Sequence, residues 1–289
     1  MVSPFIVITV IFSYYPLYGW IYSFYDWKPP FSLSQTPFVG FHMFTTLFSN
    51  PIRLGIILEV LRNTFAISGL SILTSVLPVI FAIFLSEIRV NRFKKGVQVL
   101  TTLPNFISWV MVYSMAFALF ANSGMLNNLL LSLKIISRPV QFLTSDNHTW
   151  LTMTAWSTWK GLGYGAILYL ASMSGIDREL YEAAGVDGAG RFRLIWHITI
   201  PGLIPTYMLL LLLNVANFLN NGFDQYYVFS NAFNIAHIQV LDLYVYNIGL
   251  AQGSYSMATA VNMMKSIISI ALFLGMNTLS KILRGNSIV

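Results

Sequence analysis

The sequence predicts an all-α integral membrane protein with six transmembrane helices. Hydrophobic residues make up 56% of the 289 positions and charged residues only 9%, whereas charged residues are roughly a quarter of a soluble domain. The apolar residues come in blocks of about 20 or more, which as helices can cross a hydrocarbon core of about 30 Å. A membrane β-barrel would need shorter segments of alternating polarity, and stretches such as Ala66 to Leu85 are apolar nearly all round. Helices also satisfy their own backbone groups in lipid.

Six apolar windows are the predicted spans of a single transmembrane domain, residues 1–289. They lie near residues 4–25, 65–86, 97–121, 150–174, 202–221 and 257–280. The first window is too long for the apolar core of a signal peptide and lacks a basic start, so we expect it to be retained. Its far end carries Tyr22, Tyr25 and Trp27, amphipathic rings typical of the membrane interface.

Lysine and arginine residues beside the spans predict the orientation. One side of the membrane receives nine of them, namely Arg89, Arg92, Lys94, Lys95, Arg178, Arg191, Arg193, Lys281 and Arg284. The other side receives five, namely Lys28, Arg53, Arg62, Lys134 and Arg138. Cytoplasmic loops carry the excess of basic residues, so the first side and both termini are predicted to be cytoplasmic. Segments 26–64, 122–149 and 222–256 then face outward.

Two features interrupt the simple pattern of spans and loops. Residues 38–61 mix large apolar side chains with Asn50, Pro51 and Arg53, which suits short helices lying in the membrane interface. Pro104 must kink or break the third span. A bent span is common where a cavity opens and closes, and packing alone would explain the kink equally well.

The longest predicted inner loop, residues 175–201, contains a short amphipathic helix. Asp177 is its predicted N-cap, Glu179 adds a favourable charge in the first turn, and Gly188 and Gly190 end it. Such a rod could dock in another protein's groove and pass force to the two neighbouring spans, or it could be a plain interfacial loop. From these residues alone both readings stay open.

A second helical stretch is predicted for residues 191–198 of the same loop. Ile200 precedes Pro201, and a residue before proline is pushed away from helical dihedrals. We therefore expect a sharp bend there, with Pro201 opening the fifth span.

Several stretches of the chain together form a recognisable pattern. In the inner loop they are Glu182-Ala183-Ala184, Asp187-Gly188-Ala189 and Ile198 to Pro201; elsewhere they are Arg62-Asn63-Thr64, Leu103-Pro104 with Ile107-Ser108, and Tyr255 to Lys265. The loop resembles the EAA loop of permease subunits of ATP-binding cassette importers. The wider resemblance covers nearly the whole chain and is to the carbohydrate group, in particular to importers of oligosaccharides from polysaccharides such as alginate. Ile200 stands where the family usually has leucine, a change too conservative to matter.

This resemblance implies a type I importer in a bacterial inner membrane. Such an importer has two homologous permease subunits, which we expect to be different proteins, two cytosolic ATPases and an extracytoplasmic substrate-binding protein. The chain would form half of the pathway for an oligosaccharide, an acidic one in the alginate case. The ATPase-coupling residues implied are Glu182, Ala183, Ala184, Asp187 and Gly188. The resemblance also implies that the partner ATPases bind ATP and Mg, and the absence of a G-x-x-x-x-G-K-[ST] phosphate loop from this sequence agrees with that. No cofactor, metal or enzymatic activity is expected in this chain.

Polar residues at membrane depth are the candidates for the substrate pathway, because burying them in lipid is costly. The fifth span places Asn214, Asn217 and Asn221 on one helical face. Lys160 and Lys265 lie about 15 Å and about 12 Å into their spans at 1.5 Å per residue. The remaining candidates are Trp156, Tyr164 and Asn262. Aromatic faces cover sugar C–H surfaces, amides bond hydroxyls, and a lysine pairs with a uronate carboxylate.

Each candidate also has a structural explanation. The asparagines could form interhelical hydrogen bonds worth about 1 kcal/mol, the rings could simply pack, and the lysines could pair with groups of the protein. Outside the spans, Asp242 is expected to be solvated. Asp224 fits either solvation or contact with the binding protein.

Other classes of protein are less consistent with the sequence. It has no cysteine, and His42, His148, His197 and His237 are scattered over loops without metal-ligand spacing. An ion-coupled transporter needs carboxylates inside the spans, and only Glu87 lies near one, at an edge. An intramembrane hydrolase needs a nucleophile and a base at membrane depth, and no histidine falls within a span.

Overall fold

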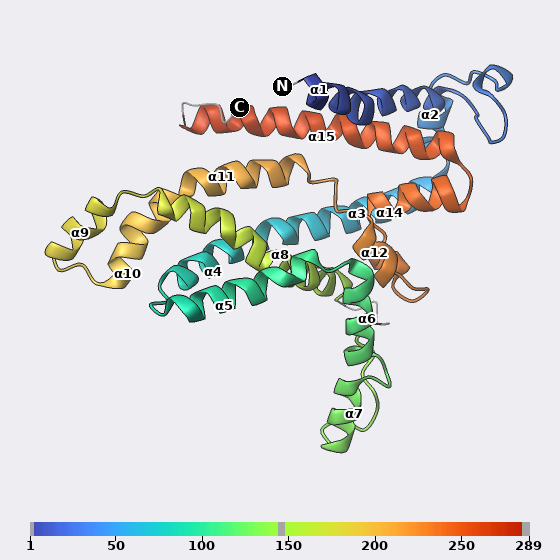
Figure 1. The fold of residues 1–289 in the computed structure, drawn as a ribbon. Helices are drawn as coiled ribbons and strands as arrows, with labels where there is room; N and C mark the ends of the chain where they lie inside the picture. Colours follow the sequence, from blue (N-terminus) through green and yellow to red (C-terminus); the bar gives the residue numbers. More distant parts are fainter. Residues whose placement is uncertain (1–2, 144–147, 285–289) are drawn as a thin grey trace.

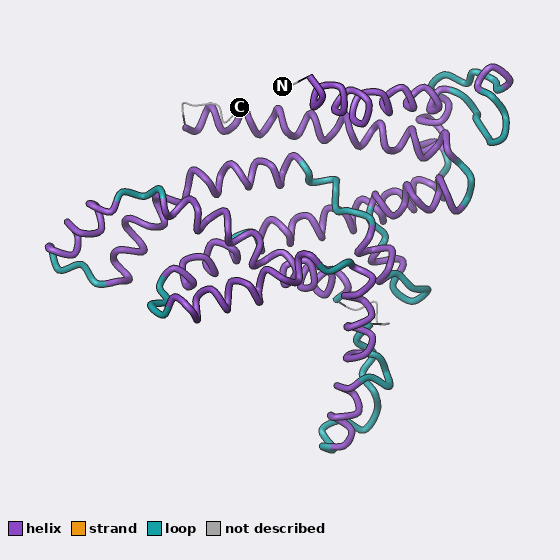
Figure 2. Tube along the Cα trace, viewed as in Figure 1, coloured by secondary structure: helices purple, strands orange, loops and turns teal. Residues whose placement is uncertain are grey.

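The computed structural model describes residues 3–143 and 148–284, and this part of the chain is built from helices (Figures 1 and 2). The α-helices are α1 (Ser3–Thr9), α2 (His42–Ser49), α3 (Pro51–Thr74), α4 (Leu77–Ser86), α5 (Asn91–Thr102), α6 (Trp109–Phe120), α7 (Met125–Ser132), α8 (Thr149–Ser174), α9 (Arg178–Val186), α10 (Arg191–Leu194), α11 (Ile200–Ala216), α12 (Asp224–Phe229), α13 (Ile235–Ile238), α14 (Leu241–Tyr246) and α15 (Tyr255–Arg284). Tighter 3₁₀ or wider π turns cover Val10–Tyr14, Tyr15–Phe24, Leu33–Gln35, Leu103–Phe106, Ile195–Thr199 and Asn247–Ala251. The predicted all-helical class is confirmed.

Five helical segments of the described chain are long and apolar enough to cross a membrane. They are Ser3–Phe24, Pro51–Ser86, Trp109–Ser132, Arg191–Ala216 and Tyr255–Thr278. Helix α8 is 26 residues long and coincides with the predicted fourth span, but it is not one of the five. It carries Lys160 near its middle, which lowers its hydropathy. The structure thus offers five to six candidate spans.

The helices lie side by side with the connecting segments gathered at two ends (Figure 1). The turn between α4 and α5 and the hairpin of α9 and α10 lie at one end, and α2, α12 and α14 lie at the other. The basic loops predicted to be cytoplasmic therefore share an end. Helices α6 and α7 extend away from the remaining helices.

The second span is longer than predicted. Residues 38–61 were expected to form separate interfacial helices, but only α2 is separate, and Pro51 begins a helix that continues to Thr74. The helix runs on because the polar pair Asn63 and Thr64 faces protein. The Asn63 amide donates to the carbonyls of Ala236 at 2.9 Å and Gln239 at 3.2 Å, and Thr64 Oγ1 accepts from the Leu241 N–H at 3.0 Å. These buried bonds pin the segment before α14 onto α3.

The third span is broken at the predicted proline. Helix α5 ends at Thr102, a 3₁₀ turn follows through Pro104, and α6 starts at Trp109. The Ser108 side chain caps α6 by accepting from the Met111 N–H at 3.4 Å. The break at Pro104 is confirmed, whereas a continuous helix over residues 97–121 is not formed, because α6 turns away from α5 (Figure 1).

Close contact between α8 and its neighbours depends on glycine. A Cβ atom on Gly163 would lie 2.3 Å from the Thr101 carbonyl oxygen, and one on Gly165 would lie 3.2 Å from the Pro78 ring. Beside them a buried apolar cluster joins α4, α8 and α11 through Ala82, Ala166 and Leu203, with other residues. Small residues let helix backbones approach closely within a membrane, and here they let α8 pack closely against α4 and α5.

Candidate functional site

Helix α9 projects at the end of the molecule that carries the basic loops (Figure 1). The Asp177 carboxylate accepts from the Glu179 N–H at 3.0 Å, as an N-cap does. At the other end Gly188 adopts a left-handed conformation with φ +73°. The Gly188 N–H bonds to the Gly185 carbonyl at 3.1 Å, and the Ala189 N–H bonds to the Ala184 carbonyl at 2.9 Å. These two bonds form a Schellman motif, in which glycine avoids the strain of the left-handed position.

The predicted coupling residues lie together on the surface of this helix and its C-terminal turn. Glu182, Ala183, Asp187 and Gly188 are exposed, and Ala184 is half-buried. Large apolar side chains surround them: Val186 is 89% exposed, and Leu180, Phe192 and Trp196 are also exposed. A patch of this kind outside a helical bundle is typical of a protein interface. The loop also carries charges of both signs, such as Glu182 and Arg191. An apolar patch with a mixed-charge rim is typical of a protein interface, which favours the docking interpretation.

The connection from α9 to the fifth span differs from the prediction. Ile200 has helical dihedrals, φ −60° and ψ −51°, and the helix is continuous from Arg191 to Ala216. The predicted bend at Pro201 is therefore wrong. A π turn over Ile195–Thr199 comes directly before α11; it displaces the regular hydrogen bonds just where proline lacks an N–H.

Side chains also hold α9 against the start of α11. The Tyr181 hydroxyl lies 3.0 Å from the Thr199 hydroxyl. The Ile176 side chain lies against Gly202, where a Cβ atom would come within 2.6 Å of it. A force applied to α9 would thus reach α11 through these two lateral contacts, and through the Gly188 turn into the helix that begins at Arg191.

A polar cavity of about 140 Å³ lies between α3, α8, the end of α11 and α12. We call it the amide cavity, because its polar lining includes Ser68, Ser157, Asn214, Asn217, Asn220, Asn221 and Gln225. The Asn221 amide donates to Ser68 Oγ at 2.7 Å, and Ser68 Oγ donates to the Phe218 carbonyl. The Asn221 Oδ1 atom is buried without a hydrogen-bond partner. The cavity therefore presents an acceptor that a hydroxyl group could satisfy.

A second cavity of about 330 Å³ adjoins the first between α3, α4, α8 and α11. We call it the serine cavity; it shares Ser71, Ser157 and Asn214 with the amide cavity and adds Ser75 and Thr158. No charged side chain of the described chain lines either cavity. Nor do residues 3–143 and 148–284 contain a cluster of three His, Asp or Glu side chains able to hold a metal ion. The chemistry of both cavities is that of hydroxyls and amides.

The three predicted asparagines meet at the amide cavity, although not as a helical stripe. Helix α11 ends at Ala216, Asn217 is its C-cap, and Asn221 lies in the loop beyond. Asn214 and Asn217 are exposed, and the Asn217 amide donates to the Leu213 carbonyl at 3.0 Å. Within the loop the Asn220 amide donates to Asn217 Oδ1 at 3.3 Å.

Lys160 faces the broken third span and lines neither cavity. Its ammonium donates to the Asn105 carbonyl at 2.8 Å and lies 5.4 Å from the centre of the Trp109 ring. Asn105 lies just past Pro104, where the helical hydrogen bonds stop, so Lys160 supplies a donor to the freed carbonyl. The side chain is half-buried, and an ammonium has three donors, which leaves two N–H groups for another partner.

The other predicted pathway residues do not gather at the two cavities. Trp156 packs in a buried aromatic cluster against Phe120 and Phe229, at ring distances of 6.0 and 5.9 Å. Tyr164 is 51% exposed on α8. Asn262 is exposed on α15. The packing interpretation fits Trp156 better than pathway lining does.

Lys265 is buried and paired. Its ammonium forms a salt bridge with the Asp242 carboxylate, and the side chains are 8% and 19% exposed. The other Asp242 oxygen accepts from the Gly222 N–H at 3.0 Å. The expected solvation of Asp242 is therefore wrong, because a lysine buried among helices needs a counter-ion. Asp224 is exposed at the start of α12.

Sequence reasoning missed Ser68, Ser71, Ser157 and Gln225 as cavity residues. A signal for α3 was present, since Ser68, Ser71 and Ser75 recur at spacings of three and four within an apolar span and so share one helical face. Gln225 gave no comparable signal. Its amide donates to the Met153 carbonyl of α8 at 2.7 Å, a contact between residues far apart in the chain.

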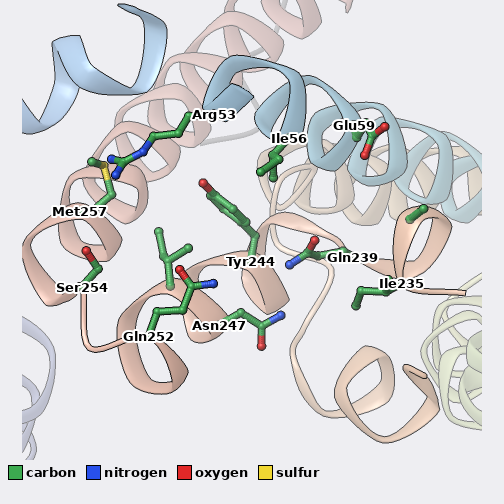
Figure 3. A pocket seen from close by; sticks show the side chains of 12 residues that line it. Arg53, Ile56, Glu59, Ile235, Gln239, Tyr244, Asn247, Gln252, Ser254 and Met257 are labelled. Atoms are coloured by element: carbon green, nitrogen blue, oxygen red, sulfur yellow. The ribbon is translucent and has the colours of Figure 1, made fainter. Parts of the chain in front are cut away.

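A larger cavity, of about 410 Å³, is lined by residues of α3, α13, α14 and α15 (Figure 3). It lies at the end of the molecule opposite α9, where α14 is found (Figure 1). Its wall combines Arg53 and Glu59 of α3 with Gln239, Tyr244 and Gln252. We call it the outer cavity. Burial raises the pKa of Tyr244, and the nearby Arg53 guanidinium partly offsets this. A mixed-charge rim of this kind is typical of a protein interface more than of a buried substrate path.

Comparison with known proteins places this geometry in context. Residues 52–286 match the family described as "Binding-protein-dependent transport system inner membrane component". Protein LplB of Bacillus subtilis (strain 168) is 37% identical over 283 residues, which cover 97% of this chain and 87% of LplB. The polygalacturonan/rhamnogalacturonan transport system permease protein YteP of the same organism is 33% identical, with coverage of 97% and 86%.

Solved structures of similar fold include a bacterial alginate ABC transporter. A chain in its complex with an alginate pentasaccharide-bound periplasmic protein has a TM-score of 0.87 and 30% identity, covering 100% of this chain and 95% of that one. A second structure, of a bacterial ABC transporter involved in the import of the acidic polysaccharide alginate, has a TM-score of 0.85 and 30% identity, with coverage of 97% and 93%.

Proposed function

This chain belongs to the family of inner membrane components of binding-protein-dependent transport systems, and from that premise we propose that it forms half of the pathway for an oligosaccharide. It is a permease subunit of a sugar-importing ATP-binding cassette transporter and not an enzyme. The family has no cofactor of its own, since ATP is bound by the ATPase partners. We further propose that the second permease subunit is a different protein and that α9 docks on one of two ATPases.

The pair of adjoining cavities supports this proposal most directly. Their walls come from α3, α8, α11 and α12, and their polar groups are hydroxyls and amides. Sugars offer many hydroxyls, which act both as donors and as acceptors. Asn214 and Asn217 are exposed, and Asn221 offers an unsatisfied oxygen. A chain that passes a hydroxyl-rich substrate needs many such weak contacts and no single tight one.

We propose acidic oligosaccharides, such as those from alginate, as the leading substrate class. YteP bears the name of a polygalacturonan/rhamnogalacturonan system, and the solved transporter of similar fold imports alginate. In this chain the supporting group is Lys160, whose ammonium is half-buried and has one described hydrogen bond, to Asn105. The remaining N–H groups could bind a uronate carboxylate.

The outward end is proposed to receive the substrate-binding protein. The outer cavity, partly lined by α14, lies at the end opposite α9 (Figure 1), and Arg53 and Glu59 are exposed there. Exposed charges of both signs steer an encounter between proteins and fix its register.

Stimulation of ATP hydrolysis tests the function as a whole. The chain should be purified with its partner permease and ATPases, reconstituted in vesicles, and given the binding protein with a panel of acidic and neutral oligosaccharides. We expect ATPase activity and uptake to rise only with binding protein and a matching oligosaccharide present together. Uptake by this chain without any ATPase would contradict the proposal.

Replacing Lys160 with methionine should weaken uptake of acidic oligosaccharides more than uptake of neutral ones, by about tenfold in kcat/KM if one charge-assisted hydrogen bond of about 1.4 kcal/mol is lost. Lys160→Arg keeps the charge and the donor to Asn105, so it should retain most of the activity. The measurement is uptake of paired acidic and neutral oligosaccharides of equal length. Equal losses for acidic and neutral oligosaccharides would show that the Lys160 charge plays no part in substrate recognition.

A further inference from the structure

The buried salt bridge between Lys265 and Asp242 connects two helices outside the amide cavity. Lys265 belongs to α15, the last long helix, and Asp242 belongs to α14. One Asp242 oxygen accepts from Lys265 Nζ, and the other accepts from the Gly222 N–H at 3.0 Å. A single carboxylate therefore ties α15 to the backbone of the loop that follows α11.

That loop, residues 217–222, carries Asn217, Asn220 and Asn221 of the amide cavity; we call it the amide loop. Gly222 has φ +83°, a left-handed conformation that presents its N–H to Asp242. At the other side of the loop the Asn221 amide donates to Ser68 Oγ of α3. The amide loop is thus fastened to α3 through Ser68 and to α14 and α15 through Asp242.

The charge of Asp242 also reaches the cavity wall. Tyr226, which lines the amide cavity, is buried. Burial raises its pKa, and the Asp242 carboxylate raises the pKa further. Lys265 and Asp242 themselves line neither the amide cavity nor the serine cavity.

We propose that Lys265 and Asp242 are positioning residues: without touching the substrate, the pair holds the amide loop in the geometry that the amide cavity needs. Lys265 holds the Asp242 carboxylate in place through the salt bridge, and Asp242 accepts from the Gly222 N–H. This proposal rests on the proposed function, because it assigns a role in substrate passage to residues outside the cavities. Removing one partner leaves the other charged and buried, which destabilises the fold more than removing both partners.

Two double variants separate charge burial from loop positioning. Asp242→Asn with Lys265→Met removes both charges but keeps an oxygen that accepts from the Gly222 N–H. Asp242→Leu with Lys265→Met also removes both charges but offers no acceptor. In the assembled importer in vesicles, we expect the first variant to keep the uptake KM within about twofold and the second to raise it by about fivefold or more. An equal KM in both variants would overturn the proposal, as would a first variant that assembles poorly.

Loop order gives a second readout that needs no substrate. The chain contains no cysteine, so Asn220→Cys provides one site for a spin label on the amide loop. We expect a more mobile label in the leucine variant than in the asparagine variant, and unchanged mobility in the latter; equal mobility overturns the proposal even if uptake fails for other reasons. If the leucine variant does not assemble, the charge-exchanged pair Asp242→Lys with Lys265→Asp replaces it, because a lysine at 242 cannot accept from Gly222. A label as immobile as in the unaltered chain would then count against loop positioning.

Discussion

Changing Gly188 to valine is expected to lower ATP-driven uptake strongly while the amount of chain in the membrane stays the same. Gly188 has φ +73°, and a Cβ atom there would meet nothing within 4 Å. The effect therefore comes from backbone conformation and not from a clash. A left-handed residue with a side chain costs about 1–2 kcal/mol, and more when it is β-branched, so the turn that ends α9 should rearrange and displace the docking surface. We expect a loss of about tenfold or more in coupled uptake.

Two matched variants distinguish loop geometry from bulk. Gly188→Asn should retain much more activity, because asparagine tolerates left-handed dihedrals. Gly190→Val adds the same side chain two residues further on, where φ is −71° and the space is open. Membrane insertion is measured by immunoblot, and ATP hydrolysis and uptake are then measured in the same vesicles. Normal uptake by Gly188→Val would contradict the coupling role assigned to residues 182–188.

The second large effect is expected from Gly163→Ala in α8. The new methyl group would lie 2.3 Å from the Thr101 carbonyl oxygen and 2.7 Å from the Thr102 nitrogen. Overpacking usually costs about 1–3 kcal/mol, and here the neighbours are backbone atoms that cannot rotate away. We therefore expect α5 and α8 to separate, with a marked loss of monodisperse protein and a lower Tm in detergent.

Gly161→Ala is the control for this variant, since a Cβ atom there meets nothing within 4 Å. It lies on the same helix two residues earlier, and replacing a helical glycine with alanine normally stabilises by about 0.5–1 kcal/mol. Its Tm should equal or exceed that of the unaltered chain. A similar drop in Tm in both variants would show that α8 tolerates no added methyl group at either position. The close contact with Thr101 would then not explain the effect of Gly163→Ala.

Local patterns in the sequence predicted the features that depend on neighbouring residues. The N-cap Asp177, the left-handed stop at Gly188 and the break at Pro104 are each governed by a few adjacent residues. The bend expected at Pro201 was wrong because the preceding turn widened into a π turn. The sequence shows that proline lacks a backbone N–H, but it does not show how the hydrogen bonds of the preceding turn rearrange.

Long-range contacts explain the differences at the candidate site. Asn214, Asn217 and Asn221 were predicted to share one helical face. In the structure α11 ends at Ala216, and the amide loop, which carries Asn217 and Asn221, is hydrogen-bonded to Ser68 and Asp242. Lys160 and Lys265 looked equivalent by depth. In the structure Lys265 has a buried counter-ion and Lys160 has a carbonyl beside a broken helix. The depth of a lysine along its helix does not show which group on a neighbouring helix it will pair with.

The sequence by itself determined that the chain is a bundle of apolar helices with the basic loops at one end. It also determined that a short amphipathic helix, α9, lies outside the bundle between two spans. These properties follow from composition, from periodicity and from the chemistry of adjacent residues, which act through short stretches of backbone. Only the tertiary structure decided which hydroxyls and amides share a cavity, which lysine is neutralised and where Gly163 meets another helix. Those contacts join residues such as Gly222 with Asp242 and Met153 with Gln225, and they form only when separate helices pack together.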